Sequence, residues 1–244
     1  MQTLNSIGEF GYLIWRVVKS LRFAWHDRGR VLHQLDYVGV RSIPLVSLIG
    51  MFAGALMAWQ AAYQFQGMVS LSILGGQVVR AVMMEMAPVL TALVISGRIG
   101  ASMAAEIGTM KVTEQIDALR TMSIDPVRYI VMPRVIGLTL MMPILTLFAV
   151  TIAVMGSFMV AEYFLDVTRQ VYFNSVREFF TLNDLLGGLF KGAVFGMIIS
   201  LVACFKGLNT SLGAQGVGQA TISAFVMCSL FILSGDFLLW IILF

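Results

Sequence analysis

The sequence has little charge for its length. Only 12% of its 244 residues are charged, whereas 59% are hydrophobic and the mean hydropathy is +0.88. A soluble domain is about 45–50% apolar and about 25% charged, so this chain has too little polar material to cover a water-facing surface. The composition therefore excludes a soluble globular protein. It predicts an all-α polytopic protein whose solvent is mostly lipid.

The chain also has few of the residues that catalytic and metal sites need. Its two cysteines, Cys204 and Cys228, lie inside apolar runs and predict neither disulfides nor a metal cluster. Its two histidines, His26 and His33, both lie in the charged N-terminal segment. No phosphate-binding loop, zinc-protease motif or nucleophile elbow is present. We therefore expect no catalytic residue, metal or cofactor here, and any ATP with its magnesium must be bound by a separate ATPase.

Five apolar runs are each long enough to cross a bilayer, whose hydrocarbon core takes about 20 residues of helix. They are predicted at about residues 43–65, 78–108, 129–164, 183–205 and 220–244. Residues 5–35 carry apolar positions at spacings of three and four with basic residues between them, which predicts an amphipathic helix on the membrane surface. A signal peptide is the alternative, but the segment has no uninterrupted apolar region and no small-residue cleavage pattern. We assign residues 1–40 to this N-terminal segment and 41–244 to the transmembrane domain.

Basic residues indicate the orientation of the spans. Lysine and arginine concentrate before the first span and around the loop between the second and third: Arg16, Lys19, Arg22, Arg28, Arg30 and Arg41, then Lys111, Arg120, Arg128 and Arg134. Because such residues favour the cytoplasmic side, we expect the N-terminus and residues 109–127 in the cytoplasm and the C-terminus outside. The net charge of +3 is too diffuse to imply nucleic acid as a partner.

Three charged residues fall at one depth inside three of the predicted spans. At 1.5 Å per residue, Glu85, Lys191 and Asp236 all lie roughly 10–12 Å below the outer surface, with Gln60 and Gln64 at a similar level. Each charge in hydrocarbon costs roughly 3 kcal/mol or more and needs a partner or water. We interpret the group as the lining of a polar cavity open to the outer side. The alternative is a buried ion pair that only fixes helix packing.

The polar segment between the second and third spans has a helical pattern of its own. Its apolar stripe is Val112, Ile116, Leu119 and Met122, and its charged side is Lys111, Glu114, Asp117 and Arg120. The segment is predicted to end at Asp125-Pro126, because the residue before proline disfavours the helical region. Such a helix can rest on the membrane, but its nearly balanced charge favours a protein partner.

Smaller patterns concern helix packing. Arg98 and Glu106 lie two turns apart and are expected to form a structural latch. Small residues recur every fourth position and permit close helix approach, within one chain or across a dimer. They are Gly50, Gly54, Ala58 and Ala62 in the first span, and Gly188, Gly192, Gly196 and Ser200 in the fourth.

The central part of the chain resembles the signature of the MlaE family. The similar segments are residues 85–119, Ile124-Asp-Pro-Val-Arg-Tyr, Lys191-Gly-Ala-Val-Phe-Gly, Gly213-Ala-Gln-Gly-Val-Gly-Gln-Ala-Thr and Gly235-Asp-Phe. Members are permease subunits of ABC transporters that move phospholipids between bacterial membranes. The resemblance covers about residues 40–244. One departure is Met84, where the family often has arginine; the partner of Glu85 is then either Lys191 or a proton.

The resemblance implies a homodimer in the bacterial inner membrane with a periplasmic C-terminus. Its implied partners are a cytoplasmic ABC ATPase dimer, a hexameric ring of MCE-domain subunits on the outer side and, in many systems, a STAS-domain subunit. Residues 109–124 would be the coupling helix that contacts the ATPase, through Glu114, Ile116, Asp117, Leu119 and Arg120. We expect a phospholipid cavity at the dimer interface, lined by Glu85, Lys191, Asp236, Gln60, Gln64, Met57, Phe65 and Met68.

Two other functions remain open from the sequence. A non-transporting membrane scaffold would use the buried charges only for packing. A proton-coupled carrier would use Glu85 and Asp236 and would transport without an ATPase. The lack of an evident internal repeat makes such a carrier a weaker interpretation.

Overall fold

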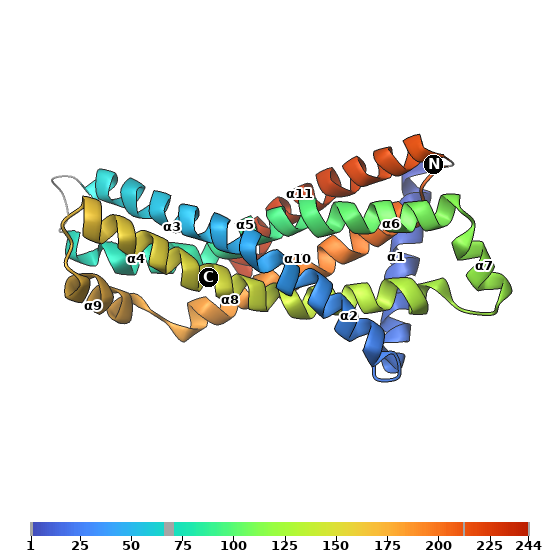
Figure 1. Ribbon diagram of the computed structural model, residues 1–244, viewed down its shortest axis with the longest axis horizontal. Coiled ribbons are helices and arrows are strands. Elements are labelled where there is room, and N and C mark those ends of the chain that lie inside the picture. The colour runs from blue at the N-terminus through green and yellow to red at the C-terminus, as the bar shows by residue number, and fades with distance from the viewer. Residues whose placement is uncertain (1, 66–70, 212, 244) are drawn as a thin grey trace.

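The computed structural model describes residues 2–65, 71–211 and 213–243, and these ranges form a bundle of long helices (Figure 1). Five helical stretches are long and apolar enough to cross a membrane. They are Arg28–Gln64, Leu71–Val112, Val127–Phe164, Leu182–Leu208 and Ala214–Leu243. The prediction of an all-α multi-pass membrane protein is thus confirmed.

The N-terminal segment forms two helices, where the sequence pattern predicted one over residues 5–35. Helix α1 (Gln2–Ser20) lies across the long helices in Figure 1, as expected for a helix on a membrane surface. After the short turn η1 (Leu21–Phe23), α2 (Arg28–Val38) runs obliquely and continues through η2 (Val40–Ser42) into α3 (Ile43–Phe65). The chain changes direction near Asp27, whose carboxylate pairs with both Arg30 and Arg128 at 2.9 Å.

The second span contains two π-helical turns, and it begins earlier than the predicted residue 78. It consists of η3 (Leu71–Ile73), α4 (Leu74–Ala81), η4 (Val82–Met86), α5 (Ala87–Ile95), η5 (Ser96–Gly100) and α6 (Ala101–Val112). A π turn shifts the hydrogen bonding of a helix by one residue and is frequent at functional sites. The turn η4 directly precedes Pro88, which lacks the N–H that would bond the carbonyl four residues earlier.

The remaining spans follow after short connections. Helix α7 (Gln115–Thr121) joins α6 to the π turn η6 (Val127–Val131), which leads into α8 (Met132–Phe164). The last two spans are α10 (Leu182–Leu208) and α11 (Ala214–Leu243). In Figure 1, α7 lies at one end of the long helices and α9 (Arg169–Phe179) at the other. We call these two ends of the bundle the α7 end and the α9 end.

Helix α9 lies in the polar and aromatic segment between the third and fourth predicted spans. It packs on α4 through Tyr172, which is fully buried and shares a hydrogen bond of 2.6 Å with the Ser157 hydroxyl of α8. The amide of Gly76 donates to the Ser175 hydroxyl at 3.0 Å. Burial raises the pKa of Tyr172, an effect that the Ser157 hydrogen bond partly opposes. The phenol therefore stays neutral and tethers α9 to α8.

Helix α8 is the centre of the bundle, with α3 on one side and α10 on the other. The predicted small-residue stripes form these contacts within one chain. A Cβ on Gly54 would overlap the Ala153 carbonyl oxygen, and one on Gly196 would lie 2.6 Å from the Leu138 carbonyl oxygen. The glycines therefore let the backbones approach more closely than side chains would allow.

Substituting Gly54 should separate α3 from α8. We expect Gly54→Ala to destabilise the protein by about 1–3 kcal/mol, because the methyl group must displace a backbone carbonyl. The matched control is Gly218→Ala in α11, where an added Cβ meets nothing within 4 Å and helix propensity improves. Thermal unfolding in detergent measures both. An equal midpoint for the two variants would contradict the close approach.

Candidate functional site

A buried ion pair joins the fourth and fifth spans. Lys191 of α10 is completely buried, and its ammonium contacts the Asp236 carboxylate of α11 at 2.8 Å. The same ammonium donates to the carbonyl oxygen of Met84 in η4 at 3.1 Å. One lysine therefore holds three segments of the chain together. Of the three charges that the sequence placed at one depth, the structure pairs Lys191 and Asp236 directly.

The position of this pair follows from Pro88. In a regular α-helix the Met84 carbonyl would accept from the N–H of residue 88, which proline lacks. The Lys191 ammonium donates a hydrogen bond to this carbonyl in place of the missing N–H. The hydrogen-bonding capacity of the backbone at the π turn is thereby used. Gly188, one turn before Lys191, lies directly against the Met83 carbonyl, and this contact brings the two backbones close enough for the lysine to reach.

Glu85 lies next to Met84, which Lys191 contacts, but its side chain faces outward. It follows Met84 in η4, and its side chain is exposed. Among the described residues, no cation lies within ion-pair distance of its carboxylate. Lys191 is thus the partner of Asp236, while Glu85 presents a polar group on the outer face of an apolar span.

The other predicted cavity residues lie on α3 or outside the described part of the chain. Gln60 and Gln64 are exposed at the end of α3, where each follows an exposed aromatic residue, Trp59 or Tyr63. Met57 is partly buried and packs on the core. The side chain of Phe65 and the whole of Met68 lie outside the described residues.

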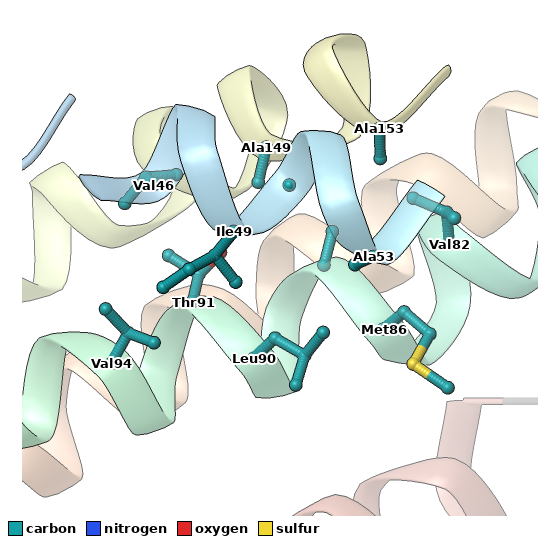
Figure 2. A pocket seen from close by; sticks show the side chains of 12 residues that line it. Val46, Ile49, Ala53, Val82, Met86, Leu90, Thr91, Val94, Ala149 and Ala153 are labelled. Atoms are coloured by element: carbon teal, nitrogen blue, oxygen red, sulfur yellow. The ribbon is translucent and has the colours of Figure 1, made fainter. Parts of the chain in front are cut away.

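An apolar pocket opens next to Glu85. Figure 2 shows it between α3, α5 and α8, with Ile49 and Ala53 of α3 facing Leu90 and Thr91 of α5. Its lining continues to Val82 and Met86, within the same π turn that carries Glu85. The turn η4 therefore carries both Glu85 and two residues of the pocket lining. The pocket was not predictable from the sequence, because residues from three separate spans form it.

Helix α7 is attached to the body by one face. Glu114 adopts a left-handed conformation with φ 59°, which turns the chain from α6 into α7. Ile116 is fully buried in a cluster with Leu13, Val17 and Ile130. Asp117 pairs with Lys111 at 3.4 Å and with Arg120 at 3.0 Å.

The predicted coupling residues therefore differ in exposure. Glu114 and Arg120 are exposed, Asp117 and Leu119 are half-buried, and Ile116 is shielded from any partner. Met122, the last residue of the apolar stripe, is 68% exposed. The surface that α7 presents to a partner thus centres on Arg120 and Met122.

The expected latch between Arg98 and Glu106 is not formed. The guanidinium of Arg98 donates to the Ser42 hydroxyl at 2.7 Å, and Glu106 pairs with Arg134 of α8 at 2.8 Å. The π turn η5 contains Arg98 and changes its direction relative to α6. Sequence reasoning therefore missed Arg134 as the partner. The sequence offered only its position just after Pro133, at the start of the third span.

These features define a multi-pass helical membrane protein with a short helix, α7, at one end and polar groups inside its spans. A family model described as Permease MlaE matches residues 31–242. A probable ABC transporter permease protein of Rickettsia typhi is 42% identical over 240 residues, which are 98% of this chain and 93% of that protein. One from Synechocystis is 40% identical over 216 residues, 88% of this chain and 82% of that protein.

A plant relative extends the comparison. The chloroplastic protein TRIGALACTOSYLDIACYLGLYCEROL 1 of Arabidopsis thaliana is 34% identical over 229 residues, 94% of this chain and 64% of that protein. The chain therefore belongs to the MlaE permease family. It is a transporter permease subunit, a class that works with an ATPase partner in a membrane.

Breaking the Lys191–Asp236 pair on one side should be more harmful than replacing both residues. We expect Lys191→Met to destabilise the protein by roughly 3–5 kcal/mol, because Asp236 and the Met84 carbonyl lose their buried partner. The double variant with Asp236→Leu should recover much of this loss. Thermal unfolding of both variants measures the coupling, and Arg120→Ala, which removes an exposed pair, should change stability by about 1 kcal/mol or less. Additive effects at 191 and 236 would contradict the coupling.

Proposed function

We propose that this chain is the permease of an ABC transporter that moves phospholipids between the inner and outer bacterial membranes. It would act as a homodimer with a lipid chamber at the interface between the two copies. The observation that carries this proposal is the exposed carboxylate of Glu85 on a membrane span.

A charged side chain facing acyl chains is costly and is normally turned toward a partner or a water-filled cavity. The turn η4 is fixed by Lys191, so Glu85 cannot turn into the core without breaking that contact. A chamber formed with a second copy of the chain provides the polar surroundings that Glu85 needs. Gln60 and Gln64, exposed near one end of α3, are the other polar groups proposed for its lining.

The chemistry around Glu85 suits a phospholipid. A phospholipid has a polar headgroup and apolar acyl chains, and η4 presents a carboxylate beside an apolar pocket (Figure 2). We propose that the headgroup lies near Glu85 and that acyl chains lie against Met57 and the pocket between α3 and α5. In this proposal Lys191 and Asp236 hold the chamber wall in place, since Lys191 is fully buried.

The two ends of the molecule suit different partners. The α7 end carries the basic residues of α1 and α2, and by the positive-inside rule this charge supports a cytoplasmic location for it. An ATPase dimer would dock on α7, with a STAS-domain subunit bound to the ATPase in some systems. The α9 end and the C-terminus would then face the periplasm, where a hexameric MCE-domain ring would receive or deliver lipid. ATP-driven closure would reach the chamber through α7 and the cluster around Ile116.

Glu85 should be needed for transport and not for assembly. We expect Glu85→Gln to lower phospholipid transfer about tenfold or more, since a charge-assisted hydrogen bond to the headgroup is lost. Transfer of a fluorescent phospholipid by the reconstituted permease–ATPase complex measures this, with Glu162→Gln, an exposed acid at the α9 end of α8, as the control. Unchanged transfer would contradict the chamber. Transfer driven by a pH gradient without ATPase would instead favour a proton-coupled carrier.

The exposed side of α7 should bind the ATPase. We expect the double variant Arg120→Glu and Met122→Asp to lower ATPase affinity about tenfold or more, because charge and shape change on the exposed surface while buried Ile116 is untouched. Co-purification of the ATPase measures this. Lys19→Glu, a charge reversal on the exposed side of α1, is the control. Full retention of the ATPase by the double variant would refute docking on α7.

A further inference from the structure

A pocket of about 350 Å³ lies between α2 and the first turns of the third span. We call it the α2/α8 pocket; its lining is Gly29, Arg30, His33, Gln34, Met110, Tyr129, Ile130, Pro133 and Arg134. The lining includes two arginines and a histidine, and no described lining residue is acidic. The pocket lies at the end of a span, where lipid headgroups meet water.

Two residues that line this pocket each carry a polar atom that is buried and has no partner among the described residues. Arg134 is 7% exposed, and its Nη2 atom pairs with Glu106 at 2.8 Å. Its Nη1 atom is buried and has no hydrogen-bond partner among the described residues, and the same is true of Gln34 Oε1. The first is an obligatory donor and the second an acceptor. Buried polar atoms are rarely left unpaired, so a ligand that accepts one hydrogen bond and donates another fits this site.

The rest of the pocket favours an anion. The guanidinium of Arg30 lies 3.8 Å from the centre of the Tyr129 ring, which holds it at the pocket wall. His33 is exposed on the same side of α2. The neighbouring acids, Asp27 and Glu106, are already paired with arginines. A single bridging water, which takes about 30 Å³ in the liquid, would fill only a small part of the space.

We propose that the α2/α8 pocket binds the headgroup of an anionic phospholipid. A phosphate oxygen accepts from Arg134 Nη1, and a headgroup hydroxyl donates to Gln34 Oε1. The site is separate from the chamber proposed around Glu85: Gly192, next to Lys191, contacts Thr146, which is about three turns of α8 from Arg134. A bound lipid would join α2 to α8 at the α7 end.

Short-chain phosphatidylglycerol tests the proposal. Its binding to the full-length protein in non-ionic detergent is measured by native mass spectrometry, beside phosphatidylcholine of equal chain length, which has neither net charge nor a headgroup donor. We expect wild type to prefer phosphatidylglycerol and Gln34→Leu to weaken that binding about tenfold, the usual effect of losing a hydrogen bond to a charged ligand. Arg30→Gln should weaken it as well. Arg28→Gln, two residues away and outside the lining, should not.

Controls separate this site from the chamber and from a free anion. Glu85→Gln should keep the preference for phosphatidylglycerol, so a failed chamber leaves this test intact. Equal affinity of wild type and Gln34→Leu, with unchanged thermal midpoints, would overturn the proposal. Inorganic phosphate that binds as tightly as phosphatidylglycerol and displaces it would overturn the assignment to a lipid headgroup.

Discussion

The carbonyl of Met84 lacks its regular α-helical donor, because Pro88 has no N–H. This single missing donor organises the middle of the bundle. Lys191 is drawn to the carbonyl at 3.1 Å, and its buried charge then requires Asp236 at 2.8 Å. The resulting contacts fix α10 and α11 to η4. They also fix the direction of Glu85, which leaves the core and faces outward. The exposed acid is thus a consequence of the buried pair.

Packed side chains connect the α7 end to α10, the helix that carries Lys191. Ile116 shares its cluster with Leu201 and Cys204 of α10, the same helix that carries Lys191. Asp125, just after α7, forms an ion pair with Arg16 of α1, so the surface helix is joined to the same region. A displacement of α7 therefore acts on α10 through this cluster. Rigid elements with packed interfaces transmit such a displacement, whereas a flexible loop would absorb it.

The sequence predicted the spans better than their interruptions. The bounds of α3 agree with the predicted 43–65, because its apolar run is preceded by Arg41 and has a proline in its first turn. That Lys191 and Asp236 lie at one level of the bundle was also predictable, from their positions in the predicted spans. Their pairing was not, because it depends on which helix faces meet. The π turns were missed because a one-residue shift leaves the apolar pattern almost unchanged. Helix α9 was missed because its burial rests on Tyr172 and Ser175, which are polar residues.

Exposed apolar surface does not by itself identify a dimer face in a membrane protein. Only 11% of the most apolar stretch of α11 is buried, compared with 56% for α10. In water such a surface would require a partner, but lipid covers it equally well, so no hydrophobic force selects between lipid and protein. A polar group is different, because hydrocarbon cannot satisfy it. Glu85 is such a group: it is exposed on the outer face of a span, in the same turn as Met84, which Lys191 contacts. In the proposed homodimer, the face that carries η4 is therefore the one that the second copy, or water held between the two copies, would cover.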